Sequence, residues 1–404
     1  LAEADGALVS AVAAAAEVLE SLQKPLAALA RRLEAVLGDA PDWLDSQARA
    51  RVEGAIRGLS WRRETLAAWI ALLGRIGGEA DPEFVDWLAV ERVDGREYDV
   101  AIHRRWLDPT KPLAAAVLAP ADGVLVTSAT LRGGEDWAAA DARTGALHLP
   151  NAGHFEAESP FDYARCSEVL IVTDVKQGDI ASLAGAYARL IGAAKGGTLG
   201  LFTAIQRLKA VHARIADRLA RDGLPLLAQH VDPIDAGTLV DIFRDDPRAS
   251  LLGTDALRDG VDVPGESLRL VVMERVPWRR PTVLQAARRM AGGGSAYDDR
   301  VVRARLAQAF GRLIRRQGDS GVFVILSAAM PSRLLKAFPP GVPISRVPLG
   351  EAIARVEQIL PRPSAGGGPP KAGEGLSTTS AADPSTIESS FNGPPPPGEL
   401  GEDL

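Results

Sequence analysis

The sequence of 404 residues contains one cysteine, Cys166, and five histidines whose spacing matches no metal site. A single cysteine cannot form a disulfide within the chain or hold an iron–sulfur cluster, so any such cluster is expected outside this chain. No uninterrupted apolar run reaches the roughly 20 residues of a transmembrane helix, and no signal peptide is visible. We therefore expect a cytoplasmic protein with no membrane partner and no metal site of its own.

The usual nucleotide-binding loops are also missing. No Gly-x-Gly-x-x-Gly opens a helix after a strand, which disfavours a Rossmann dehydrogenase. The stretch from Gly192 to Thr198 superficially resembles a phosphate loop, but its lysine, Lys195, precedes the glycine pair instead of following it. We interpret this stretch as the end of a helix with a glycine stop. There is no Asp-Glu-x-His box either.

Charge is unevenly distributed along the chain. The net charge is -6, but residues 361–404 alone hold two basic and six acidic residues. That segment is rich in proline, glycine and serine, which predicts a disordered tail. Residues 275–316, in contrast, carry eleven arginines against two aspartates. A locally basic segment of this kind is typical of a nucleic-acid-binding surface.

The first part of the chain has helical periodicity. Residues 5–37 carry an apolar seam with alternating steps of four and three, which predicts a long helix that Pro25 should kink. Further helices are expected at about 46–58 and 61–76. These helices are therefore expected to form a small all-helical unit, closed by Gly77-Gly78.

The period then changes to that of strands. Two runs within residues 84–105 are joined by Asp94-Gly95, a strong signal for a β-hairpin. A short helix is expected at about 112–118, followed by an apolar strand within 123–131. Three hydroxyl residues end that strand, namely Thr127, Ser128 and Thr130. Taken alone, they are more typical of a helix cap than of a functional site.

From residue 160 onward, apolar strands alternate with helical stretches, which predicts an α/β domain with a parallel sheet. Helices are expected near 181–194, 205–221, 235–243 and 303–316. The expected strands are Val169–Thr173, Thr198–Thr203, Pro225–Gln229, Ser250–Thr254, Leu268–Met273 and Val322–Leu326. Polar residues collect at the carboxyl ends of these strands, where such sheets bind their ligands: Thr203, Gln229, Thr254 and Glu274.

The stretch Gln308–Arg316 is strongly basic. On a helix, Arg312 and Arg315 would project from one side, with Gln308 one turn earlier. Arginine is the planar, permanently charged donor suited to bidentate phosphate contacts, and Gly311 allows close approach to the backbone. For two such arginines alone, a solvated basic helix face is the more frequent explanation.

A glycine-rich loop follows the expected strand that ends at Thr254. Within it, Gly260 and Asp262 could hold a ribose hydroxyl or couple to a metal-bound nucleotide. An ordinary turn explains Asp-Gly and Pro-Gly pairs equally well. The residues leave these two alternatives open.

Considered together, these stretches resemble the C-terminal portion of a superfamily-two ATP-dependent DNA helicase of the DinG/XPD type. Six stretches match in the order of the family: Thr127–Leu131, Ser159–Tyr163, Gly196–Thr203, Gly260–Gly265, Glu274–Trp278 and Gln308–Arg315. The Walker loop and Asp-Glu-x-His box of that family belong upstream, and this chain begins with Leu. We therefore expect a fragment that is inactive in isolation. After Leu326, Ser-Ala-Ala-Met stands where the family often has Asp-x-Arg.

The resemblance implies a RecA-like parallel sheet flanked by helices and preceded by an all-helical segment. The implied domains are a helical Arch-like segment (1–88), the C-terminal part of the first RecA-like domain (89–155), the second RecA-like helicase C-terminal domain (156–360) and the tail (361–404).

The resemblance also implies roles for single residues. Arg312 and Arg315 would be arginine fingers, oriented by Gln308, on ATP and Mg²⁺ shared with the missing first domain. Gly260 and Asp262 would sense the nucleotide. Thr127, Ser128 and Thr130 would couple domain closure to strand separation. The implied nucleic-acid contacts are Thr203, Thr254, Trp278, Arg288 and Arg289.

The family implies a monomer that moves from 5′ to 3′ on single-stranded DNA, or on a duplex with a single-stranded tail. The alternative is a non-catalytic nucleic-acid-binding module with a degenerate RecA-like fold. A phosphate loop and an Asp-Glu-x-His box upstream would favour the enzyme, and their absence would favour the module.

Overall fold

The computed structural model describes residues 4–132, 136–254, 257 and 262–360 of the chain. The predicted tail and Gly260 lie outside these described residues. Two long helices begin the chain, α1 (Gly6–Asp39) and α2 (Ser46–Leu73), and they pack on one another. Each begins with an aspartate whose carboxylate accepts a backbone N–H of the first turn, Asp5 from Leu8 at 2.7 Å and Asp45 from Ala48 at 2.6 Å.

The long first helix is confirmed, and it continues past Pro25 as predicted, whereas one expectation about the second helix is wrong. The second helix is continuous where the sequence predicts a break between residues 58 and 61. Gly58 and Ser60 are tolerated in a helix interior, since glycine costs only about 1 kcal/mol relative to alanine there. By length and composition α1 could also cross a membrane, which is weak evidence because a buried core helix and an N-terminal signal sequence pass the same test.

The hairpin is confirmed. Strands β1 (Phe84–Val93) and β2 (Arg96–Trp106) pair antiparallel around a two-residue turn. Asp94 and Gly95 both have positive φ, 50° and 78°, as a type I′ turn requires. After the hairpin come α3 (Thr110–Leu113), a π-helical turn (Ala114–Leu118), α4 (Trp137–Thr144) and a 3-10 turn (Ala146–His148).

The strand predicted within residues 123–131 is absent. This stretch is irregular, and Val124, Leu125 and Val126 are 46%, 89% and 46% exposed. A strand needs a neighbour to satisfy its backbone groups, and the described residues offer none here. The apolar residues that signalled a strand are therefore left on the surface.

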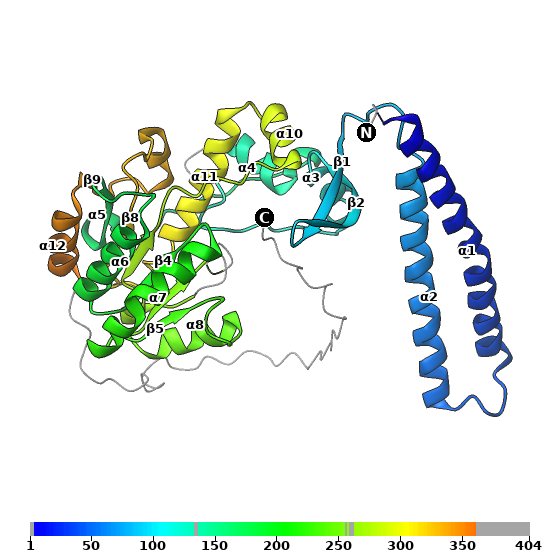
Figure 1. The fold of residues 1–404 in the computed structure, drawn as a ribbon, viewed down its shortest axis with the longest axis horizontal. Helices are drawn as coiled ribbons and strands as arrows, with labels where there is room; N and C mark the ends of the chain where they lie inside the picture. Colours follow the sequence, from blue (N-terminus) through cyan, green and yellow to red (C-terminus); the bar gives the residue numbers. More distant parts are fainter. Residues whose placement is uncertain (1–3, 133–135, 255–256, 258–261, 361–404) are drawn as a thin grey trace. The chain divides into compact units, whose positions relative to one another are not determined.

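The predicted parallel sheet is confirmed as a seven-stranded sheet in which every pairing is parallel (Figure 1). The strand order is β5-β6-β4-β7-β8-β3-β9. The strands are β3 (Ser167–Val172), β4 (Thr198–Leu201), β5 (Leu226–Ala228), β6 (Ser250–Gly253), β7 (Leu270–Met273), β8 (Gly321–Ile325) and β9 (Ile344–Val347). All but β9 were predicted. Strand β9 is an edge strand with Ser and Arg at its centre, so it lacks the apolar run that marks buried strands.

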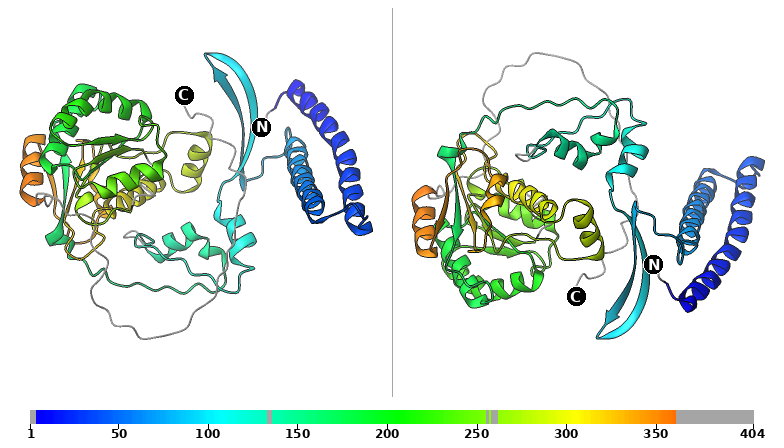
Figure 2. Two further views of the ribbon diagram at one scale, coloured as in Figure 1. Left: turned by 90° about the horizontal axis from the view of Figure 1, so that it is seen from below. Right: turned by 90° about the horizontal axis from the view of Figure 1, so that it is seen from above.

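Helices cover both faces of this sheet, as the two views of Figure 2 show. On one face lie α6 (Ile180–Ala194), α7 (Ile205–Arg221) and α12 (Leu349–Ile359). On the other lie α8 (Ala236–Asp245), α11 (Ser295–Phe310) and a 3-10 segment (Ser332–Ala337). The described part of the domain also contains three shorter helices: α5 (Tyr163–Cys166), α10 (Val283–Ala291) and a 3-10 turn (Gly265–Ser267).

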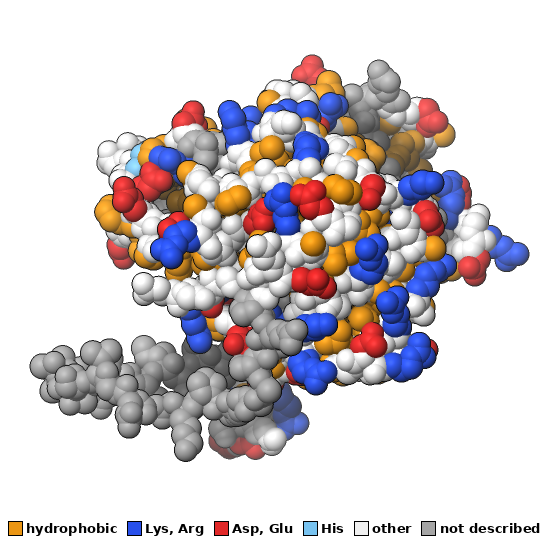
Figure 3. All heavy atoms as spheres, turned by 90° about the vertical axis from the view of Figure 1, so that its left-hand side faces the viewer, with side chains coloured by type: hydrophobic (Ala, Val, Ile, Leu, Met, Phe, Trp, Pro, Cys, Tyr) orange, Lys and Arg blue, Asp and Glu red, His pale blue; other side chains and the backbone are white. Residues whose placement is uncertain are grey.

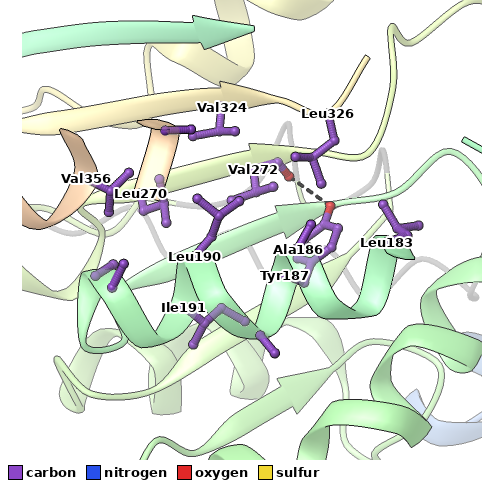
Figure 4. Close-up of a cluster of buried hydrophobic side chains, with 14 of the residues drawn as sticks. Leu183, Ala186, Tyr187, Leu190, Ile191, Leu270, Val272, Val324, Leu326 and Val356 are labelled. Carbon is purple, nitrogen blue, oxygen red and sulfur yellow. Dashed lines mark hydrogen bonds between the residues drawn. The ribbon is translucent and has the colours of Figure 1, made fainter. Parts of the chain in front are cut away.

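Each central strand supplies both cores because successive side chains point to opposite faces. In β8, Val322 and Val324 enter one core, whereas Phe323 and Ile325 enter the other. Figure 4 shows the first core, in which α6 packs on the sheet. Within it, the hydroxyl of the fully buried Tyr187 donates to the backbone oxygen of Val272 at 3.2 Å.

Candidate functional site

The basic stretch does not form the predicted helix. Helix α11 ends at Phe310, and residues 311–316 are turns and irregular backbone. The reason lies in Leu313 and Ile314, which are only 2% and 5% exposed and belong to the second core. The chain leaves the helix at Gly311 to bury these two side chains. Arg312 and Arg315 therefore flank a pair of buried anchors.

A tight contact fixes the far end of this segment. A Cβ at Gly321, the first residue of β8, would lie 2.9 Å from Cδ2 of Leu313. Glycine is thus needed there to let the segment return against the strand. We call residues 311–321 the arginine segment.

Asp319 holds the same segment by its backbone. Its Oδ2 atom accepts the backbone N–H of Arg315 at 2.9 Å and that of Arg316 at 2.8 Å. The preceding Gly318 has φ of 100°, a conformation that favours glycine and turns the chain back toward the arginines. The position of the Arg315 backbone is therefore set by buried anchors on one side and a carboxylate on the other.

The side chain of Arg315 reaches Asp262. Its Nε lies 3.4 Å from Oδ1 of Asp262, with the two side chains 34% and 74% exposed. Asp262 leads into β7 and Arg315 into β8, and these strands are neighbours in the sheet. The sheet therefore brings together two residues that the sequence predicts for one nucleotide site. Arg312 is half-buried in the same segment, and Gln308 is exposed on the last turn of α11.

A second polar cluster lies at the carboxyl ends of the strands, centred on Glu274. This side chain is fully buried directly after β7. Its carboxylate pairs with the guanidinium groups of Arg207 and Arg275, and it accepts the backbone N–H of Thr203 at 3.2 Å. The side chain of Gln177 donates to the backbone oxygens of Glu274 and Leu326. We call this the Glu274 cluster. It ties together the ends of β4, β7 and β8.

The other predicted nucleic-acid residues differ in how strongly they are engaged. The side-chain oxygen of Gln229 accepts both the backbone N–H and the hydroxyl of Thr254, each at 3.0 Å. Trp278 is 42% exposed. The guanidinium of Arg288 donates to the backbone oxygens of Trp106 and Leu107, and that of Arg289 pairs with Asp298 at 2.6 Å.

The predicted coupling residues form a local turn. The hydroxyl oxygen of Ser128 accepts the backbone N–H of Thr130 at 3.2 Å and lies 3.3 Å from the hydroxyl of Thr130. Thr127 and Ser128 are exposed. This is the capping-type arrangement that hydroxyl residues favour when considered alone.

Sequence reasoning missed three residues of these clusters, Asp319, Arg207 and Gln177. An aspartate after a glycine, just before an apolar strand, is a turn signal that could have indicated Asp319. Arg207 and Gln177 leave no comparable signal, since their contacts span the sheet.

The distribution of surface charge can be followed on one face of the molecule. In Figure 3, basic and acidic side chains alternate over the face that carries α12, with no continuous basic patch.

Metal and thiol chemistry find little support in the described parts of the chain. Those residues contain no group of three or more His, Cys, Asp or Glu side chains placed to hold a metal ion. Cys166 is half-buried, and burial raises the pKa of its thiol, which disfavours the nucleophilic thiolate.

Comparison with known proteins bears on the arginine segment and on the Glu274 cluster. Residues 187–340 match the family described as helicase C-terminal domain. That range includes Asp262, Glu274, Arg315 and Asp319. The ATP-dependent helicase DinG of Mycobacterium tuberculosis (strain H37Rv) is 36% identical over 266 residues, covering 62% of this chain and 39% of that protein. The chain resembles the C-terminal portion of DinG-type helicases.

Two further similarities accompany these. The protein named 3'-5' exonuclease DinG of Bacillus subtilis (strain 168) is 32% identical over 264 residues, covering 62% of this chain and 28% of that protein. The structure of S. cerevisiae Dbp5 bound to RNA and ADP BeF3 covers 55% of this chain and 52% of that chain, with 18% identity and a TM-score of 0.39.

These findings confirm the predicted resemblance to the C-terminal portion of DinG-type helicases. The aligned part spans well under half the length of the DinG relatives. The domain limits and the roles of single residues stay predictions.

Proposed function

We propose that this chain is the C-terminal part of an ATP-dependent DNA helicase. It couples ATP hydrolysis to movement on single-stranded DNA, from 5′ to 3′, and to duplex unwinding. It acts in the cytoplasm as a monomer. The proposal rests on the helicase C-terminal domain match and on the similarity to DinG helicases.

One observation carries the proposal, namely the approach of Arg315 to Asp262 at 3.4 Å. A nucleotide site needs a cation for the terminal phosphate next to a group that senses the nucleotide. Both residues are partly exposed, so a phosphate could reach them. Their pairing brings together two of the stretches on which the family resemblance depends.

The arginines would act on the phosphoryl group in the transition state. The guanidinium of Arg315, with that of Arg312, would stabilise the charge that develops on the γ-phosphoryl oxygens. ATP would be held between this chain and a lobe that carries the phosphate loop. That lobe would supply the ligands of Mg²⁺, and the bound Mg²⁺ would neutralise the phosphate oxygens. Gln308 would orient the arginines or the attacking water. Gly260 and Asp262 would sense the bound nucleotide and link its presence to nucleic-acid binding.

Single-stranded DNA would bind at the other end of the sheet. Thr203, Thr254 and Trp278 all follow strands, whereas Arg315 precedes one, and the strands are parallel. Phosphate oxygens accept hydrogen bonds, but the Thr254 hydroxyl already donates to Gln229. Binding through Thr254 therefore requires an exchange of this bond, whereas the exposed Trp278 can stack on a base directly. Thr127, Ser128 and Thr130 would transmit domain closure to the strand-separating parts.

The deciding experiment is Arg315→Ala in the helicase that carries this chain together with a phosphate-loop lobe. Loss of an arginine finger lowers turnover by about 10³- to 10⁵-fold in related phosphoryl-transfer systems. We expect DNA-stimulated ATP hydrolysis to fall in that direction, while Arg316→Ala, the neighbouring exposed arginine, stays near wild type. Hydrolysis by Arg315→Ala at the wild-type rate would refute the finger.

The proposed binding of single-stranded DNA is tested by measuring how affinity depends on salt concentration. Single-strand binding by Arg289→Ala should show a shallower dependence of log K on log salt, by roughly 0.7 for each phosphate that the variant no longer neutralises. Arg288→Ala is the comparison, because the Arg288 guanidinium is engaged by two backbone oxygens. Equal slopes for wild type and Arg289→Ala would show that Arg289 does not contact the nucleic-acid phosphates.

The alternative, a non-catalytic nucleic-acid-binding module, draws on the absence of a phosphate loop from the sequence. It predicts single-strand binding that does not respond to ATP in any longer protein carrying this chain. A response of DNA affinity to ATP that Arg315→Ala abolishes would favour the enzyme.

A further inference from the structure

The carboxylate of Asp319 plays no part in the mechanism proposed above, yet it makes two of the contacts that fix the arginine segment. One oxygen accepts the backbone N–H of Arg315 at 2.9 Å and of Arg316 at 2.8 Å. The backbone N–H of Asp319 in turn donates to the backbone oxygen of Arg316 at 3.2 Å. Asp319 thus closes a small loop directly beneath the arginine that reaches Asp262.

These two contacts matter because of where the N–H groups lie. Residues 315 and 316 belong to neither a helix nor a strand, so no regular ladder satisfies their backbone donors. Hydrogen bonds to an ionised carboxylate are shorter and about twice as strong as those between neutral groups. A single side chain therefore fixes two consecutive peptide units at the base of the Arg315 side chain.

The remaining supports lie before Arg315 and at Gly321, and neither contacts the backbone N–H groups of residues 315 and 316. Leu313 and Ile314 anchor the chain just before Arg315. Between Arg315 and Gly321, where β8 begins, the chain passes through Gly318, whose φ of 100° marks an open turn with nothing within 4 Å of a Cβ placed there. Without the Asp319 carboxylate, the peptide units after Ile314 would lose both of their fixed partners.

We propose that Asp319 is a positioning residue for Arg315. It does not touch the nucleotide but holds the backbone from which the Arg315 guanidinium reaches the γ-phosphate. The inference rests on the proposed role of Arg315 as an arginine finger. Misplacement of a catalytic group by about 1 Å costs on the order of 10²-fold in rate. We therefore expect Asp319→Ala to lower kcat about 10- to 100-fold, with KM for ATP changed less than threefold.

A double-mutant cycle separates positioning from general support of the fold. The variants are Asp319→Ala, Arg315→Ala and the double variant, measured in the helicase that carries this chain with its phosphate-loop lobe. If Asp319 acts through Arg315, adding Asp319→Ala to Arg315→Ala lowers kcat less than about twofold further. Effects that multiply in full would overturn the proposal, as would wild-type kcat for Asp319→Ala.

A matched control is available in Asp235, the N-cap of α8. Its carboxylate likewise accepts a backbone N–H, from Thr238 at 3.0 Å, but in another part of the domain. Asp235→Ala should leave kcat within twofold of wild type. If Asp235→Ala lowers kcat as much as Asp319→Ala does, then loss of any such carboxylate contact is enough to lower kcat, and the proposal fails. Asp319→Asn, which keeps one acceptor oxygen, should fall between wild type and Asp319→Ala even if the alanine variant folds poorly.

A second readout distinguishes failure of this inference from failure of the proposed function. In the 404-residue chain, amide hydrogen exchange at Arg315 and Arg316 should be at least tenfold faster in Asp319→Ala, with the strands of the sheet unchanged. Unchanged exchange at these two amides overturns the positioning role whatever the activity. Faster exchange combined with wild-type hydrolysis by Arg315→Ala shows instead that the finger assignment was wrong.

Discussion

Asp262 and Arg315 lie 3.4 Å apart, Oδ1 to Nε, although they lead into different strands. Because the carboxylate is 74% exposed, an ion pair of this kind contributes only about 0–1 kcal/mol to stability. The guanidinium can therefore leave Asp262 for a phosphate at little cost. In the proposed mechanism, Asp262 would hold the Arg315 guanidinium near the nucleotide without competing strongly for it.

Arg315→Lys should fail to replace the arginine. Lysine keeps the positive charge but lacks the planar fork that binds phosphate oxygens in pairs. We expect its DNA-stimulated kcat to lie closer to that of Arg315→Ala than to wild type. Arg316→Lys, one residue further on, should stay within twofold of wild type. A lysine variant with more than half of wild-type kcat would show that charge alone is sufficient.

Glu274→Ala should destabilise the domain by about 3–5 kcal/mol. Its fully buried carboxylate pairs with Arg207 and Arg275, and removing one partner of a buried pair leaves charge without compensation. The control is Glu351→Ala, which removes an exposed helix pair with Arg355 and should cost less than about 1 kcal/mol. Urea unfolding of both variants measures the difference. Equal losses would contradict the view that burial sets the cost.

Gly196→Ala should cost about 3 kcal/mol or more. Gly196 has φ of 89°, and a Cβ there would lie 2.2 Å from the backbone oxygen of Arg248. Both strain and overlap with backbone oppose the methyl group. Gly192→Ala, in α6 with nothing within 4 Å of the added carbon, should be neutral or stabilise by up to about 1 kcal/mol. Thermal unfolding of the pair tests this. A similar melting temperature for both would be inconsistent with the close approach at Gly196.

Tyr187→Phe should have an effect that depends on pH. Burial raises the pKa of the Tyr187 phenol well above its usual value, and its hydroxyl donates to Val272. Below about pH 9 the lost hydrogen bond should cost on the order of 1 kcal/mol. Above about pH 10 the unfolded phenol loses its proton while the folded one retains it, so wild-type stability falls as pH rises.

The phenylalanine variant has no phenol at this position, so its stability does not fall with pH for this reason. The stability difference between the two proteins should therefore shrink as pH rises above about 10. Urea titrations at about pH 8 and at about pH 10.5 to 11, on either side of the ordinary phenol pKa, measure it. A difference that widens with pH would mean that Tyr187 ionises more easily in the folded chain than in the unfolded one.

Three features can be predicted from the sequence alone: the parallel α/β architecture, the type I′ hairpin at Asp94-Gly95 and the resemblance to DinG-type helicases. These features depend on local periodicity, on turn chemistry or on short ordered motifs, all of which can be read along the chain. Residues such as Arg315 and Asp262 could be selected for the same reason. Nothing in their separation along the chain said that they would meet.

Other features depend on contacts between segments that lie far apart in the sequence. Arg315 meets Asp262 because β7 and β8 are neighbours, and the order of strands in a sheet depends on contacts between segments far apart in sequence. Helix α11 ends before the arginines because the core takes up Leu313 and Ile314. The apolar stretch before Thr127 forms no strand because the described residues offer it no partner. In each case the deciding interaction involves a group that local pattern cannot specify.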